Sequence, residues 1–433
     1  MDASDTRLAF ALISMEGPDQ YSQAGGLGVR VNQLGRALAA TGFPTRLYFV
    51  GDPELPAEEV RDRLELRRIG REISREFPGG VYQGERLKVG YLGARLPPEL
   101  VEGWIVPQIQ AGRLPVLIFE EWQTAGWTQR TFELLRARDL GDRCLVLWNA
   151  NNQFGFEQMD WVGLDQAAGI TTISRHMRLL VGGFGVDPIV IPNGIPEEYL
   201  APVDEAAVRS LRRAAAPRQL LLKVGRFHRD KRWIQAVRAL AELRAAEVPV
   251  RMLVRGGEEH YRREVMGAAR EGGLRVEPWD EEVSSVSDLA RALAATPDVD
   301  LLELTRFLPE ELLPVLYASS LAVLANSGFE PFGLVGLETM AAGGVAVVGG
   351  TGEDYARHLH NSLVIETDSP RELAQVIRRV VAHPATGREI RRAARQMAAT
   401  YSWPLVVEGD LLPRLPLLAQ RRGIVWPESG PAA

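Results

Sequence analysis

The sequence is poor in the features that mark secreted and membrane proteins. Its 433 residues contain a single cysteine, Cys144, which excludes an internal disulfide and a metal site built from several cysteines. No apolar run approaches the roughly 20 residues that a membrane-spanning helix requires. The first residues, MDASDTRLAF, lack the basic start and the small-residue cleavage site of a signal peptide. We therefore expect a cytoplasmic protein without a transmembrane segment.

Lysine is also scarce, and the 56 acidic residues outnumber the 50 basic ones. The net charge of -6 argues against broad binding to nucleic acids. Only three lysines are present, Lys88, Lys223 and Lys231, so a lysine within a short motif is informative. The hydrophobic and charged fractions, 46% and 24%, are ordinary for a soluble globular protein. The length suffices for two domains, because single hydrophobic cores stop growing near about 250 to 300 residues. Nothing in the sequence indicates the oligomeric state.

The most informative stretch is NSGFEPFGLVGLETMAAGG at residues 326–344. SLAVLA before it and GVAVVGG after it are typical of buried strands, and Pro331-Phe332-Gly333 opens a predicted helix. A loop carboxylate, Glu330, therefore stands beside a helix N-terminus, which favours an anion. Glu338, in the second turn, can reach a neighbouring pair of hydroxyls. The alternative is that Glu330 caps the helix and Glu338 is a solvated surface residue.

The stretch resembles the E-x7-E motif of the retaining GT-B glycosyltransferases of family 4, the group that includes glycogen and sucrose synthases. In that family the first glutamate contacts the hydroxyls of the donor sugar and the second contacts the ribose of the nucleotide. The resemblance implies these roles for Glu330 and Glu338. It also implies that the donor lies against the start of the helix, at Phe332, Gly333, Leu334 and Val335.

A second motif, KVGRFHRDK, follows a predicted strand that ends at Val224. Arg226 and Lys231 bracket its loop, and two cations around a glycine turn can face a diphosphate from two sides. A chance basic pair is the alternative in an arginine-rich chain. The motif resembles the GR…K signature of the same family, whose arginine and lysine neutralise the leaving diphosphate. Further on, Arg306 stands where the nucleotide base usually lies in the family; stacking on the base and a surface ion pair both stay open.

The first half of the chain carries weaker signals. Gly25 and Gly26 open a predicted helix after a strand, a pattern that either admits a phosphate or sugar or simply makes a tight turn. It resembles the GG loop of the same family, which implies a donor-binding role. Glu121 follows a predicted strand at 114–119 and is either an anchor for an acceptor hydroxyl or a helix cap. Asn151 and Asn152 stand near the place of a family histidine; asparagine can hydrogen-bond but cannot shuttle a proton.

The predicted fold class is α/β, with two doubly wound Rossmann-like domains that face each other across a cleft, as in GT-B proteins. We expect an acceptor-side domain at residues 1–195, a hinge region at 196–217 and a nucleotide-sugar-binding domain at 218–400. Residues 401–433 would form a helix that crosses back to the first domain, followed by a tail.

The resemblance implies retaining transfer of a sugar from a nucleotide diphosphate sugar to a hydroxyl-bearing acceptor, such as a sugar or small glycoside. We expect no cofactor and no required divalent cation, because no DxD-type carboxylate pair stands where a cation bound to diphosphate would need it. Arg226, Lys231 and the amides of residues 333–335 would stabilise the charge of the leaving diphosphate. The alternatives are a noncatalytic sugar-nucleotide-binding homologue and a GT-B phosphorylase or epimerase.

Overall fold

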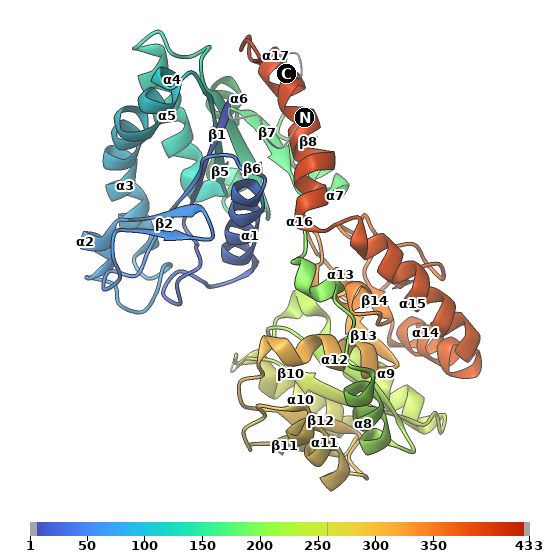
Figure 1. Ribbon diagram of the computed structural model, residues 1–433. Coiled ribbons are helices and arrows are strands. Elements are labelled where there is room, and N and C mark those ends of the chain that lie inside the picture. The colour runs from blue at the N-terminus through green and yellow to red at the C-terminus, as the bar shows by residue number, and fades with distance from the viewer. Residues whose placement is uncertain (1–6, 258, 428–433) are drawn as a thin grey trace. The chain divides into compact units, whose positions relative to one another are not determined.

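The computed structural model describes residues 7–257 and 259–427, and Figure 1 shows its helices and strands. The chain divides into two compact units. Unit 1 comprises Met1–Gly194 and Tyr401–Ala433, and unit 2 comprises Ile195–Thr400. Each unit is built on its own sheet, so the two doubly wound α/β domains that the sequence predicts are present.

Unit 1 contains a sheet of eight strands in the order β3-β4-β2-β1-β5-β6-β7-β8, parallel except for the β3/β4 pair. Every residue of β1 and β5 is buried, as expected for a parallel sheet that is covered on both faces. The strands are β1 Leu8–Ser14, β2 Thr45–Val50, β3 Glu58–Arg61, β4 Leu64–Ile69, β5 Leu114–Glu120, β6 Leu145–Ala150, β7 Gly169–Thr172 and β8 Ile189–Val190.

The helices of unit 1 come from both ends of the chain. Trp403, Val406 and Leu415 share one hydrophobic core with β1, so the C-terminal segment completes this unit. The α-helices are α1 Gly26–Ala40, α2 Arg71–Ser74, α3 Glu85–Leu100, α4 Val106–Gln110, α5 Ala125–Arg136, α6 Trp161–Ala167, α7 Arg175–Gly182, α16 Trp403–Val406 and α17 Leu412–Arg421. Short 3-10 helices are η2 Trp122–Thr124 and η3 Phe156–Gln158, and π-helical turns are η1 Val101–Ile105 and η7 Val407–Leu411.

Unit 2 contains a parallel sheet of seven strands in the order β11-β12-β10-β9-β13-β14-β15. The strands are β9 Gln219–Val224, β10 Val250–Arg255, β11 Val276–Trp279, β12 Leu301–Leu304, β13 Ala322–Ala325, β14 Ala346–Val348 and β15 Leu363–Val364. The α-helices are α8 Glu205–Ala215, α9 Trp233–Ala245, α10 Tyr261–Glu271, α11 Val286–Ala295, α12 Leu313–Ser319, α13 Leu334–Ala341, α14 Pro370–Ala382 and α15 Pro384–Ala399. Three 3-10 helices are η4 Glu197–Leu200, η5 Arg229–Lys231 and η6 Glu310–Leu312.

Residues 196–217, which the sequence analysis treats as a hinge region, lie within unit 2. They contain η4 and α8, and Val208, Leu211 and Ala215 of α8 are buried in a core shared with α11 and α12. The amphipathic pattern of α8 therefore serves packing. The polar stretch at 258–300 contributes α10, α11 and the edge strand β11.

The order of strands in each sheet locates the places where ligands bind. In open parallel sheets, ligands bind beyond the carboxyl ends of the strands, where the winding of the chain reverses direction. In unit 1 this point lies between β1 and β5, and in unit 2 it lies between β9 and β13.

Within the ranges 7–257 and 259–427, the structure has no helix both long and apolar enough to cross a membrane.

Candidate functional site

The loop after β13 in unit 2 is shaped around Gly333, which precedes the first residue of α13. Gly333 adopts a left-handed conformation with φ of 85°. A Cβ atom there would lie 2.7 Å from Cγ of Glu353 and 2.9 Å from the Tyr355 hydroxyl, so glycine is required on two grounds. The first amide groups of α13 have no partners within the helix. The loop therefore presents an anion-binding helix start at the switch point of the sheet.

Lys231 and Glu330 are brought together from positions 99 residues apart. Lys231 ends η5, which follows β9, and Glu330 lies in the loop after the adjacent strand β13. Their Nζ and Oε2 atoms are 2.5 Å apart, with the side chains 32% and 18% exposed. Two of the residues predicted to act on the donor thus form one partly exposed ion pair at the switch point.

Further hydrogen bonds join the region of β9 and its following loop to that of β13 and its following loop. The Gly328 amide donates to the carbonyl oxygen of Asp230 at 2.7 Å. The buried Lys223 ammonium donates to Asn326 Oδ1 at 2.6 Å and to the carbonyl oxygen of Leu324 at 3.0 Å. Burial, followed by the charge of Lys231, lowers the pKa of Lys223 well below its usual value. The sequence analysis noted Lys223 only because lysine is rare in this chain. In the structure, its hydrogen bonds link β9 to β13 and to the residue that follows β13 closely, Asn326.

Arg226 lies in the same loop with its side chain exposed. Its carbonyl oxygen accepts a hydrogen bond from Trp233 Nε1 at 2.8 Å, which fixes the backbone. Among the described residues no carboxylate forms an ion pair with its guanidinium, in contrast to Arg229 and Arg232 nearby, which pair with Glu264 and Asp368. Arg226 is therefore available to an anionic ligand.

Glu338 lies in the second turn of α13 and is partly buried. The Tyr317 hydroxyl donates to its Oε2 atom at 3.3 Å. Burial raises the pKa of Glu338 to about 7, and no basic side chain in the described part of the chain forms an ion pair with it. Hydroxyl donors from a ligand would satisfy its remaining lone pairs.

A third loop, after β14, holds Glu330 in place and was missed by the sequence analysis. The Glu330 amide donates to Thr351 Oγ1 at 2.9 Å, and the Gly352 amide donates to the Glu330 carbonyl oxygen at 2.9 Å. Glu353 Oε2 accepts from the Thr351 amide at 3.1 Å. A Cβ atom on Gly352 would lie 2.1 Å from the Pro331 carbonyl oxygen. The glycines in the sequence GGTGE, residues 349–353, could have indicated that two backbone segments approach each other closely here.

Glu353 is 6% exposed, and its Oε1 atom has no hydrogen-bond partner within the described residues. Burial, followed by the charge of Glu330, raises the pKa of Glu353 to about 7. A carboxyl group with a raised pKa holds its proton in the folded state at pH values where the unfolded chain has lost it. Its contribution to stability therefore declines as pH rises from its unfolded value toward 7.

We expect Glu353→Gln to stabilise the protein more at pH 8 than at pH 5, because the amide cannot ionise in its buried position. The change in the free energy of unfolding should differ between the two pH values by about 1 to 3 kcal/mol. Urea denaturation at both pH values measures it, with Glu389→Gln on the surface of α15 as the control. An effect of equal size at both pH values would contradict the assignment.

The other residues of unit 2 that were predicted to contact the donor differ in exposure and in their contacts. Arg306 is exposed and its Nε atom donates to the carbonyl oxygen of Asp280 at 3.1 Å, so its surface bond is a backbone contact and not the ion pair left open above. Phe332 is 2% exposed and packs edge-on against Tyr355 at 5.8 Å. Because the ring is buried, Phe332 can contact a donor only through its backbone. Leu334 and Val335 are partly exposed at the start of α13.

In unit 1, the glycine loop is closed by a carboxylate that the sequence analysis overlooked. Glu16, just after β1, accepts hydrogen bonds from the amides of Gly25 and Gly28 at 3.0 Å each. Glu16 thus occupies the anion position at the start of α1. A donor phosphate at this position would have to displace Glu16 from the amides of Gly25 and Gly28, and the donor-binding role of Gly25 and Gly26 stays a prediction.

Glu120 ends β5 and Glu121 follows it, and the two carboxylates have different surroundings. Glu120 is fully buried and paired with Arg30 at 3.2 Å, and it accepts hydrogen bonds from Asn149 and Asn151. Glu121 accepts from the Asn151 amide at 2.6 Å through Oε1, while Oε2 has no partner among the described residues. Burial raises the pKa of Glu121 to about 8. Asn151 is thus shared by both carboxylates, whereas Asn152 accepts from the Phe154 amide in a local turn.

Glu121 also has a strained backbone, with φ of 71° and ψ of 166°. This region is essentially restricted to glycine and costs about 1 to 3 kcal/mol. Although Glu121 precedes the 3-10 helix η2, its side chain makes no capping hydrogen bond, so the helix-cap alternative is wrong. A strained, buried carboxylate at the switch point indicates a functional residue.

We expect Glu121→Gly to be more stable than Glu121→Ala by about 1 to 2 kcal/mol, because both lose the carboxylate but only glycine relieves the backbone strain. Equilibrium unfolding in urea compares the two variants directly. At an ordinary helical position such as Glu133 the same pair should show the reverse order. If alanine proved as stable as glycine at position 121, the strain would be refuted.

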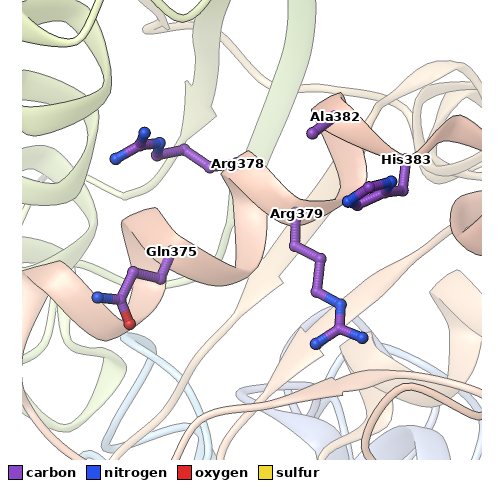
Figure 2. Close-up of a pocket in the computed structure, with 5 residues that line it drawn as sticks. All are labelled: Gln375, Arg378, Arg379, Ala382 and His383. Carbon is purple, nitrogen blue, oxygen red and sulfur yellow. The ribbon is translucent and has the colours of Figure 1, made fainter.

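The surface of α14 carries a shallow depression. Figure 2 shows that it is lined by Gln375, Arg378, Arg379, Ala382 and His383. The side chains of Arg378 and Arg379 extend in different directions and do not converge on a common point. This surface therefore does not form an anion site. Within the described ranges, no group of three or more histidine, cysteine or acidic side chains is arranged to hold a metal ion.

Comparisons with known proteins indicate the family that this chain resembles. Residues 209–397 match the profile of the family described as "Glycosyl transferases group 1". A D-inositol 3-phosphate glycosyltransferase from Nocardiopsis dassonvillei is 28% identical over 238 residues, which are 54% of this chain and 52% of that protein. The chain thus spans about half the length of this curated relative.

Two solved structures share the fold over nearly the whole chain. Sucrose-phosphate synthase from Thermosynechococcus elongatus superimposes with a TM-score of 0.68 at 21% identity, covering 95% of this chain and 100% of that chain. The catalytic domain of starch synthase IV from Arabidopsis thaliana, bound to ADP and acarbose, gives a TM-score of 0.67 at 16% identity, covering 96% and 99%. These likenesses confirm the predicted fold class.

Proposed function

We propose, on the premise that this chain belongs to the GT-B glycosyltransferases of the glycogen and sucrose synthase group, that it moves a sugar from a nucleotide diphosphate sugar to an acceptor hydroxyl with retention of configuration. The family prediction made from the E-x7-E and GR…K motifs is confirmed. The observation that carries the proposal is the Lys231–Glu330 pair beside the Gly333 helix start, at the switch point of unit 2.

The leaving diphosphate gains negative charge as the glycosidic bond to the nucleotide breaks. Arg226 lacks an ion-pair partner among the described residues, Lys231 is within reach of a ligand, and the first amides of α13 are free of helical partners. Preorganised donors of this kind stabilise developing charge most effectively. We assign Arg226 and Lys231 to the diphosphate and Glu330 to the hydroxyls of the donor sugar.

Glu338 is assigned to the ribose of the nucleotide. Its partial burial and its lack of a basic partner in the described chain favour a neutral donor such as a hydroxyl pair. The starch synthase neighbour binds ADP, which supports a nucleoside diphosphate as the ligand class. The base and the sugar are left to experiment, and Arg306 remains the proposed neighbour of the base.

We propose that no divalent cation and no cofactor are required, because Arg226, Lys231 and the helix start supply the positive charge that a cation would otherwise supply. Activity should therefore persist in excess EDTA. With no side-chain base assigned, an oxygen of the leaving phosphate takes the proton from the acceptor hydroxyl on the same face of the sugar. This geometry preserves the anomeric configuration.

The acceptor is assigned to unit 1, at the carboxyl edge near β5 and β6. One carboxyl oxygen of Glu121 has no hydrogen-bond partner within the described chain. The other accepts a hydrogen bond from the backbone amide of Asn151. Asn152 lies in the next turn. A hydroxyl-bearing sugar or small glycoside suits such groups.

The proposal is tested by incubating the protein with UDP-, ADP- and GDP-sugars, with and without a panel of hydroxyl acceptors. We expect release of nucleoside diphosphate from one donor, stimulated by an acceptor, and a product whose anomeric proton coupling matches that of the donor. Tight donor binding without release would favour a noncatalytic sugar-nucleotide-binding protein. Release stimulated by inorganic phosphate would favour a phosphorylase, and an inverted product would refute retention.

A further inference from the structure

Five side chains at the carboxyl edge of the unit 1 sheet form what we call the acidic cluster: Glu16, Tyr82, Glu85, Glu121 and Gln123. The Tyr82 hydroxyl donates to Glu16 Oε1 at 2.5 Å, and Gln123 Nε2 donates to Glu85 Oε1 at 2.8 Å. Burial, followed by the charges of Glu16, Glu121 and Glu85, raises the pKa of Tyr82. Glu16 is thus in direct contact with the Tyr82 hydroxyl, and the charges of Glu121 and Glu85 also act on it.

The acidic cluster has no matching positive charge. In the described part of the chain, Glu16, Glu85 and Glu121 form no ion pair, whereas the adjacent Glu120 is paired with Arg30. The amides at the start of α1 compensate Glu16 in part. Lys88, the lysine of this unit, is directed to the carbonyl oxygens of Gly80 and Val81 and to the Tyr21 hydroxyl. A cation is therefore the missing element.

Two buried acceptor atoms in the cluster also lack hydrogen bonds within the described residues. They are Oε2 of Glu121 and Oε1 of Gln123, in side chains that are 2% and 5% exposed. The orientation of the Gln123 amide is set by Glu85, because a reversed amide would turn its oxygen toward a carboxylate. A buried polar atom without a partner costs about 1 to 3 kcal/mol. The Gln123 oxygen accepts hydrogen bonds, and so does the Glu121 oxygen once that carboxyl group is ionised, so a positively charged donor would satisfy both atoms and favour the ionised form of Glu121.

We infer that the acceptor substrate carries a protonated amine that donates to Glu121 and Gln123, as in an amino sugar or an aminocyclitol. The inference rests on the proposed function and specifies its acceptor class. An ammonium group supplies three donors together with the positive charge that the cluster lacks. A phosphorylated acceptor would bring like charge against three carboxylates and is excluded on the same grounds. Tyr82, 40% exposed, places the edge of the cluster at the surface.

A neutral polyol is the competing ligand, because its hydroxyls can also donate to both oxygen atoms. A protonated amine and a polyol hydroxyl differ here in the charge of the donating group. Glucosamine, glucose and N-acetylglucosamine differ at one position and present an ammonium, a hydroxyl and a neutral amide there, while glucose 6-phosphate adds negative charge. Their dissociation constants, measured by calorimetric titration without a donor, separate the possibilities.

We expect glucosamine to bind about tenfold more tightly than glucose and N-acetylglucosamine, which corresponds to one charge-assisted hydrogen bond, and glucose 6-phosphate to bind most weakly. Equal affinities for the first three ligands, or tighter binding of the phosphate, would overturn the inference. This comparison on the unmodified protein stands whether or not any variant folds.

Glu121→Gln keeps the shape of the side chain and removes its charge, and Gln123→Leu removes the second acceptor atom. Both should reduce the preference for glucosamine over glucose to within about twofold, while Glu133→Gln on the exposed face of α5 should retain it. A preference that persists in both folded variants would place the amine elsewhere and refute the assignment.

The outcome for the proposed function is read separately, from release of nucleoside diphosphate. Release that is stimulated only by neutral acceptors would refute the amine and leave the glycosyltransferase proposal intact. Amine binding in a protein that releases nucleoside diphosphate from none of the donors would support the site and refute the transfer.

Discussion

Lys231→Ala should lower kcat about 10² to 10³-fold while changing the affinity for the donor much less. Lys231 is placed to meet charge that grows on the diphosphate as the bond breaks, and removal of one preorganised donor at such a site typically has this effect. Lys231 is paired with Glu330 at 2.5 Å, so the variant also leaves that carboxylate without its cation. Steady-state kinetics with the donor identified by the panel measures both quantities.

The matched control for Lys231→Ala is Arg229→Ala, two residues away in the same loop. Arg229 is exposed and pairs with Glu264, on the surface of α10. Its removal should leave kcat within about twofold of the unmodified protein, since exposed ion pairs contribute little. Unchanged kcat and KM in Lys231→Ala would remove this lysine from the mechanism.

Glu338→Ala should weaken binding of the free nucleoside diphosphate and of the intact sugar nucleotide alike, by roughly ten- to a hundredfold. This is the cost of about 1.5 to 3 kcal/mol for a lost hydrogen bond to a charged group. Glu330→Ala should spare the affinity for the free diphosphate and reduce transfer, because a misplaced anomeric carbon loses the benefit of orientation.

Calorimetry with both ligands places the two glutamate variants on one scale, and Glu311→Ala, exposed on η6, serves as the control. The separation of roles has a structural basis. Glu330 lies in the loop beside Lys231, whereas Glu338 faces Tyr317 one turn into α13. Identical binding profiles for the two variants, or no change in either, would show that the roles assigned from the E-x7-E motif are wrong.

Much of the fold could be predicted because the strands of parallel sheets are buried on both faces and appear as short apolar runs. The runs that become β1, β5, β9 and β13 are of this kind. The two motifs placed Lys231 and Glu330 in loops that each follow a strand, whereas the adjacency of these strands and the resulting ion pair came from the structure. Pro196 and Pro217 frame the region predicted as a hinge, and the sequence analysis did not identify α8 within it, whose apolar face packs within unit 2.

Other parts of the site depend on contacts that local patterns do not encode. Thr351 bonds to Glu330, and Glu353 to Thr351, only because the loop after a third strand, β14, packs against the loop of Glu330 with glycine at the closest points. Glu16 fills the helix start at Gly25 because the turn after β1 folds back over it. The strained backbone of Glu121 lies where β5 meets η2. The residue type gives no indication of it, because glutamate stands where the conformation favours glycine.

The central claim, that a nucleoside diphosphate binds at the switch point of unit 2, is tested most directly by amide hydrogen exchange with and without the diphosphate of the active donor. The account predicts slower exchange in peptides that cover residues 225–233 and 329–341, where the loops of Lys231 and Glu330 meet the start of α13. Protection that is absent there, or confined to unit 1, would contradict it.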